Sequence, residues 1–364
     1  MKHTRGRVVL VESVDDLDRR LSAGARDLAG WRLCGLDLAD RSAELAACRV
    51  AGATFVGCEL AAGDRRRIEV VGGLVLPAPA ERPVDVHRTA LYTPDELYDN
   101  PTYARSLDAL AYAWSQRPAS PQDMLAMALH DHAVDGALAA WAGPRRLVGV
   151  MGGHAAHRDD AAYADAARLG HALGAAYSVA TGGGPGAMEA VNLGARLSRR
   201  PGSDLDQALG MLADVPTFRP SLDAWAEAAF DVCGRFADPV DSVGIPTWHY
   251  GHEPPNVFAT VIAKYFRNAT REAILLEICG AGIVFLPGAG GTVQEIFQDA
   301  CENYYADETS VAPMVLVGRT YWTETLPAWP LLQALARGRP MERHVHLVET
   351  LDEAVAVLSP PAAR

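Results

Sequence analysis

A short apolar run, a glycine turn and a predicted helix make up the most chemically informative stretch of this 364-residue chain. Residues 282–286 are rich in β-branched and aromatic side chains, which predicts a buried strand. The next turn holds three glycines that can take positive φ and approach a ligand closely: Gly288, Gly290 and Gly291. A helix starting near Gly291 or Thr292 would direct its free amides at an anion. Glu295, one turn later, either faces that anion site or stabilises the helix dipole.

A second glycine turn, TGGGPGAME, occupies the same position between another predicted strand and helix. Its candidate anion-binding residues are Gly183, Gly184, Gly186 and Met188. The predicted strand over residues 145–153 is followed by a turn, which places Gly153 and His154 beside the same anion site. Because parallel strands end at one edge of a sheet, the two turns should converge. Two converging helix N-termini predict a phosphate pocket.

Other nucleotide-binding classes fit the sequence less well. Gly182, Gly184 and Ala187 match a relaxed dinucleotide fingerprint, but the match follows the second strand of the unit and Pro185 interrupts it. Dinucleotide redox chemistry is therefore the weaker interpretation. The chain has no GKS or GKT sequence, so the lysine of a P-loop NTPase is absent. Lys264 is the one plausible Schiff-base residue in a chain with two lysines.

The paired glycine turns, with an arginine upstream, resemble the LONELY GUY family of phosphoribohydrolases and the related bacterial nucleoside 5′-monophosphate nucleosidases. The family motif PGGxGTxxE is matched by Pro287, Gly288, Gly291, Thr292 and Glu295. Ala289 replaces the middle glycine, which the turn tolerates only if that position does not need positive φ; Gly290 is the candidate to take over. Arg271 lies sixteen residues before Pro287 and matches the family's catalytic arginine, with Arg267 as the alternative. The resemblance covers about residues 145–305.

The resemblance implies a hydrolase that cleaves the N-glycosidic bond of a nucleoside 5′-monophosphate, giving free base and ribose 5-phosphate. Glu295 would stabilise the ribosyl cation or orient the water, and Arg271 would fix the ribose or Glu295. The glycine turns and Thr292 would hold the 5′-phosphate. No cofactor is expected. The alternative from another class is a non-catalytic nucleotide or molybdenum-cofactor carrier, but a carboxylate aimed into the site favours the hydrolase.

The same resemblance implies a homodimer or a higher homo-oligomer. The helix that carries Arg271 and Phe266 is expected to offer its apolar face to the partner subunit. His249, His252 and Glu253 lie in a loop rich in Trp, Tyr and Pro, and they could line the base pocket. This loop does not have a spacing that predicts a metal site. His130 and His132, two residues apart on a predicted helix, point in different directions and do not predict one either.

Strand and helix signals alternate through residues 89–364 and predict one α/β domain with a Rossmann-like parallel sheet and helices on both faces. Capping patterns at Thr93 and Ser120 predict helix starts. Later helices are expected over residues 161–175, 186–197, 257–278, 323–336 and 351–358. Strands are expected over residues 145–153, 177–184, 207–212, 282–286, 313–318 and 344–348.

Residues 1–88 form a separate N-terminal appendage in this interpretation. A five-residue period, interrupted once by Arg41 and Ser42, runs over residues 31–60. Hydrophobic residues hold the centres of its units: Leu33, Leu38, Leu45, Val50, Phe55 and Leu60. The period resembles the pentapeptide-repeat family, which implies a small β-helix-like appendage that must dock on a neighbour to bury its apolar end. A loose helical segment with an accidental period is the alternative.

Composition restricts the possible partners and location. The net charge of −12 argues against nucleic-acid or anionic-membrane binding. No signal peptide or membrane span is indicated, so a cytoplasmic location is expected. The six cysteines lack CxxC spacing, which indicates neither a disulfide framework nor a zinc site: Cys34, Cys48, Cys58, Cys233, Cys279 and Cys301.

Overall fold

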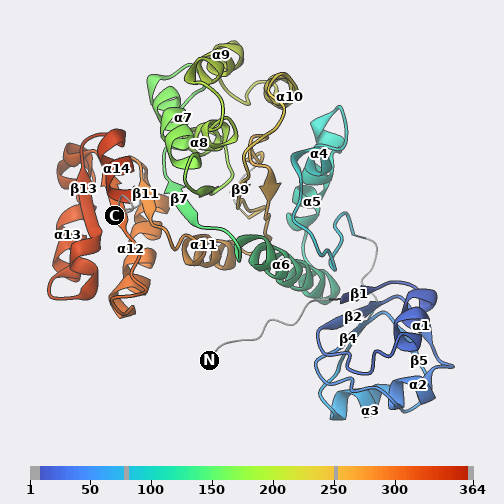
Figure 1. Cartoon of the computed structure of the whole chain (residues 1–364). Helices are drawn as coiled ribbons and strands as arrows, with labels where there is room; N and C mark the ends of the chain where they lie inside the picture. Colours follow the sequence, from blue (N-terminus) through green and yellow to red (C-terminus); the bar gives the residue numbers. More distant parts are fainter. Residues whose placement is uncertain (1–8, 78–81, 250–252, 360–364) are drawn as a thin grey trace. The chain divides into compact units, whose positions relative to one another are not determined.

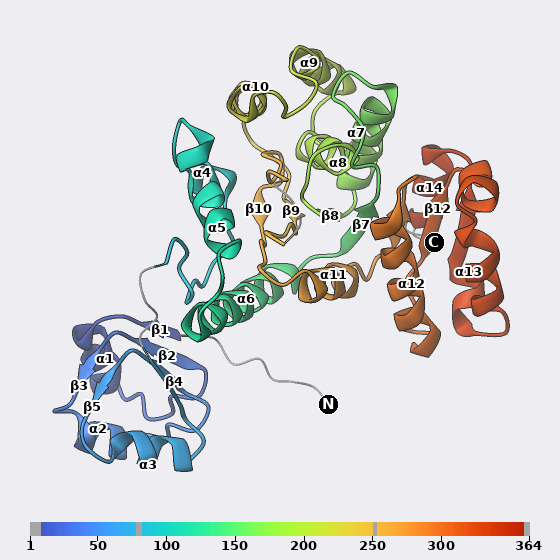
Figure 2. The ribbon, with the colours of Figure 1, turned by 180° about the vertical axis from the view of Figure 1, so that it is seen from behind.

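The structure, a computed structural model, describes residues 9–77, 82–249 and 253–359, and it divides into two compact units (Figures 1 and 2). The first unit comprises Met1–Ala90 and Pro118–Ala137, and the second comprises Leu91–Arg117 and Leu138–Arg364. The sequence does not indicate that Pro118–Ala137 groups with the first unit. Within the described residues, no helix is both long and apolar enough to cross a membrane.

Seven parallel strands form the sheet of the second unit, in the order β10-β9-β8-β7-β11-β12-β13. Their bounds are Leu147–Met151 (β7), Ser178–Thr181 (β8), Ser242–Gly244 (β9), Val261–Ile262 (β10), Ile283–Phe285 (β11), Met314–Val317 (β12) and Val345–Val348 (β13). The chain adds strands outward from β7 to β10, and then β11 pairs with the other side of β7. Strand order therefore reverses between β7 and β11, the point where open α/β sheets bind ligands.

Helices cover this sheet and confirm the Rossmann-like α/β fold. Those of the second unit are α4 (Pro94–Leu97), α5 (Leu107–Ser115), α7 (Ala161–Gly174), α8 (Ala187–Arg196), α9 (Gly202–Ala213), α10 (Leu222–Arg235), α11 (Asn268–Glu277), α12 (Gly290–Tyr305), α13 (Ala328–Ala336) and α14 (Leu351–Leu358), with α6 (Pro121–Ala142) divided between the units. Short helical turns cover Tyr103–Arg105, Tyr321–Thr325 and Pro340–His344. The helix α7 packs against α8 and α14, whereas α12 packs against α11 and α13 (Figure 1).

The two predicted helix starts are confirmed by their side-chain caps. The Thr93 hydroxyl accepts a hydrogen bond from the Glu96 amide at 3.2 Å, and α4 begins at the next residue. The Ser120 hydroxyl accepts from the Asp123 amide at 3.1 Å, and α6 begins at Pro121. Both caps satisfy amides that the first helical turn leaves without partners.

Two predicted elements are wrong. Residues 207–212 lie inside α9 rather than in a strand, because Leu205, Ala208 and Leu212 are buried at helical spacing. The helix expected over residues 257–278 begins only at Asn268, and the apolar residues before it include the strand β10. Short apolar runs do not distinguish a buried strand from a helix.

The first unit is a small stack of strand–helix coils. Its four-stranded parallel sheet has the order β1-β2-β4-β6, and β3 pairs with β5 beside it. The elements are β1 (Val9–Val11), α1 (Val14–Ser22), β2 (Trp31–Cys34), β3 (Asp37–Leu38), α2 (Ser42–Ala46), β4 (Thr54–Val56), β5 (Glu59–Leu60), α3 (Asp64–Val70) and β6 (Leu74–Leu76). A strand of the main sheet therefore recurs every 20–23 residues, counted from residues 9, 31, 54 and 74.

The strands of the appendage pair in parallel, as in a β-helix, but its coils are not built of strands alone. The helices α2 and α3 replace part of each coil, because their Ala, Leu, Arg and Glu residues favour helix and each points one apolar side chain, Leu45 or Ile68, into the core. The predicted central residues up to Phe55 are buried, and Leu60 is half-buried. The last coil leaves three large apolar side chains exposed: Val70, Val71 and Leu74.

Deleting residues 1–88 is expected to reduce solubility or change the oligomeric state while sparing the chemistry. The deletion removes most of the unit to which Pro118–Ala137 belongs, and it leaves that segment without its own unit's core. Light scattering and an activity assay on the truncated chain test this. A soluble truncated chain with unchanged assembly and no activity would contradict a purely structural role for the segment.

Candidate active site

A cavity of about 180 Å³ lies at the carboxyl ends of the central strands, and we call it the reaction cavity. Strands β7 and β11 end side by side, since Met151 pairs with Phe285 and the Leu286 amide donates to the Met151 carbonyl at 2.9 Å. The reaction cavity therefore occupies the place where the strand order reverses. Several residues predicted from the sequence line it: His154, Gly184, Met188, Arg271, Gly291, Thr292 and Glu295.

The turns after β7 and β8 interlock at the rim of the reaction cavity. Gly153 and Gly186 both have positive φ, at 71° and 82°. A Cβ atom on Gly186 would lie 2.5 Å from the His154 carbonyl oxygen, and the Ala187 amide donates to the Gly153 carbonyl at 2.9 Å. These contacts leave no room for a side chain on Gly186, so the two turns fix each other.

The turn before α12 uses its glycines differently from the prediction. Gly288, Gly290 and Gly291 can take positive φ, but none of the three adopts it, and Ala289 has φ −105°. Alanine therefore fits its position without strain. A Cβ on Gly288 would clash with the Thr292 hydroxyl, whereas Cβ atoms on Gly290 and Gly291 would meet nothing within 4 Å. Gly290 and Gly291 thus leave open space beside the first turn of α12, whose free amides favour an anion.

Arg271 and Glu295 face each other across the reaction cavity. The distance from Arg271 Nη1 to Glu295 Oε1 is 3.9 Å, and the two side chains are only 11 % and 13 % exposed. Glu295 lies one helical turn beyond the amides that open α12, roughly 5 Å along the axis. A ligand anchored by an anion at the helix start would therefore place its next group beside this pair.

A polar network holds Arg271 in place. The Asn268 side-chain oxygen accepts from Arg271 Nε at 3.2 Å and from Nη2 at 2.8 Å, which leaves Nη1 directed at Glu295. Asn268 in turn donates to Glu272 at 2.6 Å, and Gln294 of α12 donates to the other oxygen of Glu272. The network joins α11 to α12. Its three supporting residues could not be predicted from the family motif, which does not reach Asn268 and Glu272 and leaves the position of Gln294 unspecified.

Burial raises the pKa of Glu295 to about 7, against the opposing effect of the Arg271 charge. The nearby Glu272 carboxylate raises the pKa of Glu295 further. A carboxyl group with a pKa near neutrality can accept or donate a proton at physiological pH, which suits it to general acid or base catalysis.

Comparisons with known proteins assign no family. No family model matches the chain, and no curated protein matches it. Among solved structures, the molybdenum cofactor binding protein of Rippkaea orientalis is 16% identical and covers 59% of this chain and 95% of its own, with a TM-score of 0.37. The molybdenum cofactor carrier protein MCP of Chlamydomonas reinhardtii is 17% identical and covers 59% of this chain and 96% of its own, with a TM-score of 0.35. The protein TM1055 is 18% identical and covers 58% of this chain and 97% of its own, with a TM-score of 0.34. These similarities assign no function to the chain.

Some predicted site residues lie beside the reaction cavity rather than on its wall. Gly153, Gly186, Gly288 and Gly290 shape the turns, and Gly183 packs against Pro246. Six further residues line the wall: Gly152, Gly182, Pro246, Thr247, Glu253 and Ala289. Glu253 was predicted for a base pocket. Gly152 and Gly182 directly precede predicted residues, so the positions where the strands end could have indicated them.

The other candidate side chains fall outside the reaction cavity. Arg267 is exposed and does not line it, which favours Arg271 over the alternative. His249 is exposed, and His252 lies outside the described residues. Lys264 is 1 % exposed and pairs with Asp108 at 2.7 Å, so it does not reach the cavity as a Schiff-base lysine would.

The expected subunit contact at Phe266 is wrong. Phe266 is buried, stacked on Trp248 with ring centroids 4.5 Å apart and edge-on to Trp114 at 5.2 Å. It also precedes α11 rather than belonging to it. The ring therefore has no free face for a partner, and the homo-oligomer stays a prediction.

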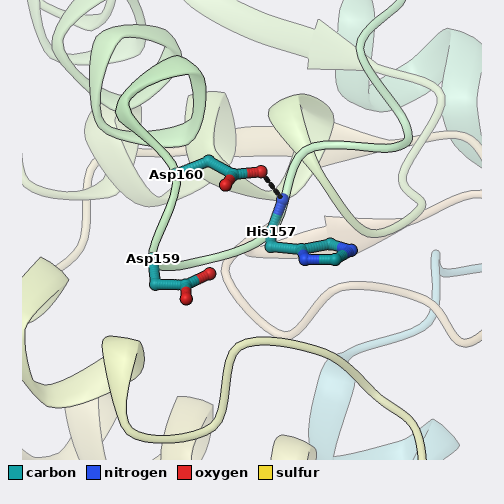
Figure 3. A group of neighbouring side chains, drawn as sticks. All are labelled: His157, Asp159 and Asp160. Atoms are coloured by element: carbon teal, nitrogen blue, oxygen red, sulfur yellow. Dashed lines mark hydrogen bonds between the residues drawn. The ribbon is translucent and has the colours of Figure 1, made fainter.

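Within the described part of the chain, one group of side chains has metal-ligand spacing: His157, Asp159 and Asp160 (Figure 3). Their ligand atoms lie within 4.8 Å of one another, and all three side chains are exposed. They belong to the single loop between β7 and α7, where the Asp160 carboxylate accepts from the His157 amide at 2.7 Å (Figure 3). That hydrogen bond explains Asp160 without a metal.

The raised pKa of Glu295 predicts how stability depends on pH. Because its pKa is higher in the folded chain than in the unfolded chain, the folded state binds more protons between about pH 4.5 and 7, and the free energy of unfolding falls as pH rises through this range. Glu295→Gln removes the buried charge, so it should raise the melting temperature at pH 8 and have a smaller effect at pH 5. Calorimetry at both values measures the difference, and an equal effect at both would exclude the raised pKa.

Proposed function

We propose that the chain hydrolyses the N-glycosidic bond of a nucleoside 5′-monophosphate, releasing the free base and ribose 5-phosphate. The observation that carries the proposal is the buried Arg271–Glu295 pair, which lies one helical turn from the open N-terminus of α12. An anion carrier has no use for a carboxylate aimed at its ligand, whereas glycosidic cleavage requires one.

In this proposal the 5′-phosphate lies at the start of α12. The amides of Gly290 and Gly291 belong to the first turn and have no partners within the helix, and the Thr292 side chain lies at the same end. Binding energy from the phosphate then positions the ribose for reaction.

Bond cleavage builds positive charge on the ribose, and Glu295 in its carboxylate form stabilises that charge or accepts a proton from the attacking water. The water oxygen bonds to C1′, the electrons of the broken bond go to the base nitrogen, and the proton that the water gives up ends on that nitrogen. Arg271 holds Glu295 and hydrogen-bonds the ribose. Asn268 and Glu272 keep Arg271 in place.

The test is to incubate the purified protein with AMP, GMP, CMP and UMP and to measure released base by chromatography. Release of base and ribose 5-phosphate in equal amounts from any of the four supports the proposal. Binding of a nucleotide without release would instead favour a carrier, and the absence of both would remove the nucleotide-hydrolase proposal.

A further inference from the structure

A second cavity of about 420 Å³ adjoins the reaction cavity, and we call it the side cavity. His154 borders both cavities. The turn after β8 also separates them, since Gly184 faces the reaction cavity and the next residue, Pro185, faces the side cavity. The far wall is the loop between α9 and α10, with Phe218 and Arg219, backed by Trp225 of α10.

A buried ion pair fixes that far wall. Arg158 and Glu189 lie 2.5 Å apart, and each side chain is 1 % exposed. The Arg158 amide donates to the Pro216 carbonyl at 3.0 Å, and its guanidinium donates to the Trp225 carbonyl at 3.0 Å. The guanidinium carbon also lies 4.4 Å from the centre of the Trp225 ring. The loop that faces the side cavity is therefore held at both ends by one arginine.

The side cavity is lined by two aromatic rings, and the Arg219 guanidinium lies over one of them. Phe218 is half-buried and meets Trp225 edge-on, with ring centroids 6.2 Å apart. The Arg219 guanidinium lies 5.7 Å from the centre of the Phe218 ring, and His154 and His157 line the other side. Such a lining suits a planar heteroaromatic ring, which packs against the phenyl ring and offers acceptor atoms to the basic groups.

We infer that the side cavity binds the base of the nucleotide, with Phe218 as the stacking residue; this rests on the proposed function. The reaction cavity, at about 180 Å³, is below the roughly 300 Å³ at which pockets enclose a small organic ligand. It has room for the phosphate and ribose but not also for the base. The adjoining side cavity, entered past His154, supplies the missing space and the stacking surface.

Calorimetric titration of Glu295→Gln, in which turnover is suppressed, with AMP, CMP and ribose 5-phosphate tests the inference. Adding Phe218→Ala should weaken AMP and CMP binding by roughly tenfold, the scale of one lost base–aromatic stack. Ribose 5-phosphate binding should not change, because that ligand reaches only the reaction cavity. Phe218→Tyr, which keeps the ring, should restore nucleotide affinity.

Unchanged nucleotide affinity in Phe218→Ala would overturn the inference and leave the proposed function standing. Glu253→Gln is the matched control, because Glu253 lines the reaction cavity but not the side cavity. A selective loss of nucleotide affinity in that variant alone would place the base there and would also overturn the inference. If neither AMP, CMP nor ribose 5-phosphate binds the parent protein, both the inference and the proposed function fail. An equal loss for all three ligands in Phe218→Ala would show that the change disturbs the fold, and it would contradict a base-specific role.

Discussion

Glu295→Gln is expected to lower turnover by about two orders of magnitude or more while leaving nucleotide affinity nearly unchanged. Glutamine keeps the size and the hydrogen-bonding reach of the side chain but has neither its charge nor its basicity. The phosphate anchor at the start of α12 is untouched, so ground-state binding should persist. Steady-state kinetics with the best nucleotide, together with calorimetric binding, separate the two effects.

Glu302→Gln is the matched control, because Glu302 is an exposed glutamate on the same helix and does not line the reaction cavity. It should have normal turnover. If Glu295→Gln lost binding and turnover equally, Glu295 would be a structural residue of α12, and the dipole interpretation of its position would be correct.

The strand, turn and helix that carry Glu295 could be predicted from the sequence because their signals are local. An apolar β-branched run, Pro287 and the glycines mark the end of β11, and the helix begins at Gly290, within one or two residues of the prediction. The φ angles of the turn could not be predicted from the same residues. Glycine permits positive φ but does not require it, and this turn uses its glycines for space.

The side cavity and the network around Arg271 could not be predicted because their contacts are distant in sequence or carry no motif. Arg158 joins Glu189 and Trp225, which lie 31 and 67 residues away. Gln294 joins Glu272, 22 residues away. A single sequence shows each of these residues as an ordinary charged or polar side chain on a helix or loop, and only the fold brings them together.

The first unit shows how a real periodicity can indicate the wrong element. The predicted central positions do reach the core, from Leu33 to Phe55. Each short element carries only one of them, since Leu33, Leu38 and Phe55 lie in strands and Leu45 lies in α2, so the period does not set the backbone conformation. Burial was therefore predictable where backbone conformation was not.

Arg271→Ala should reduce both nucleotide affinity and turnover, with a combined loss in kcat/KM of about a hundredfold or more at pH 7. The substitution removes the guanidinium that lies 3.9 Å from Glu295 and lowers the pKa of that carboxyl. Without it the pKa of Glu295 should rise further, since burial and the charge of Glu272 then act unopposed. The acid limb of the pH–rate profile should therefore move to higher pH, and part of the lost activity should return at alkaline pH.

Arg267→Ala supplies the control, since Arg267 is exposed, lies four residues earlier and does not line the reaction cavity. It should leave both the rate and its pH dependence unchanged. Loss of activity in Arg267→Ala with normal activity in Arg271→Ala would transfer the catalytic role to the exposed arginine. A fall in rate for Arg271→Ala without any movement of the acid limb would separate Arg271 from Glu295 and limit it to holding the substrate, because removing a charge that lowers the pKa of Glu295 must shift that pKa.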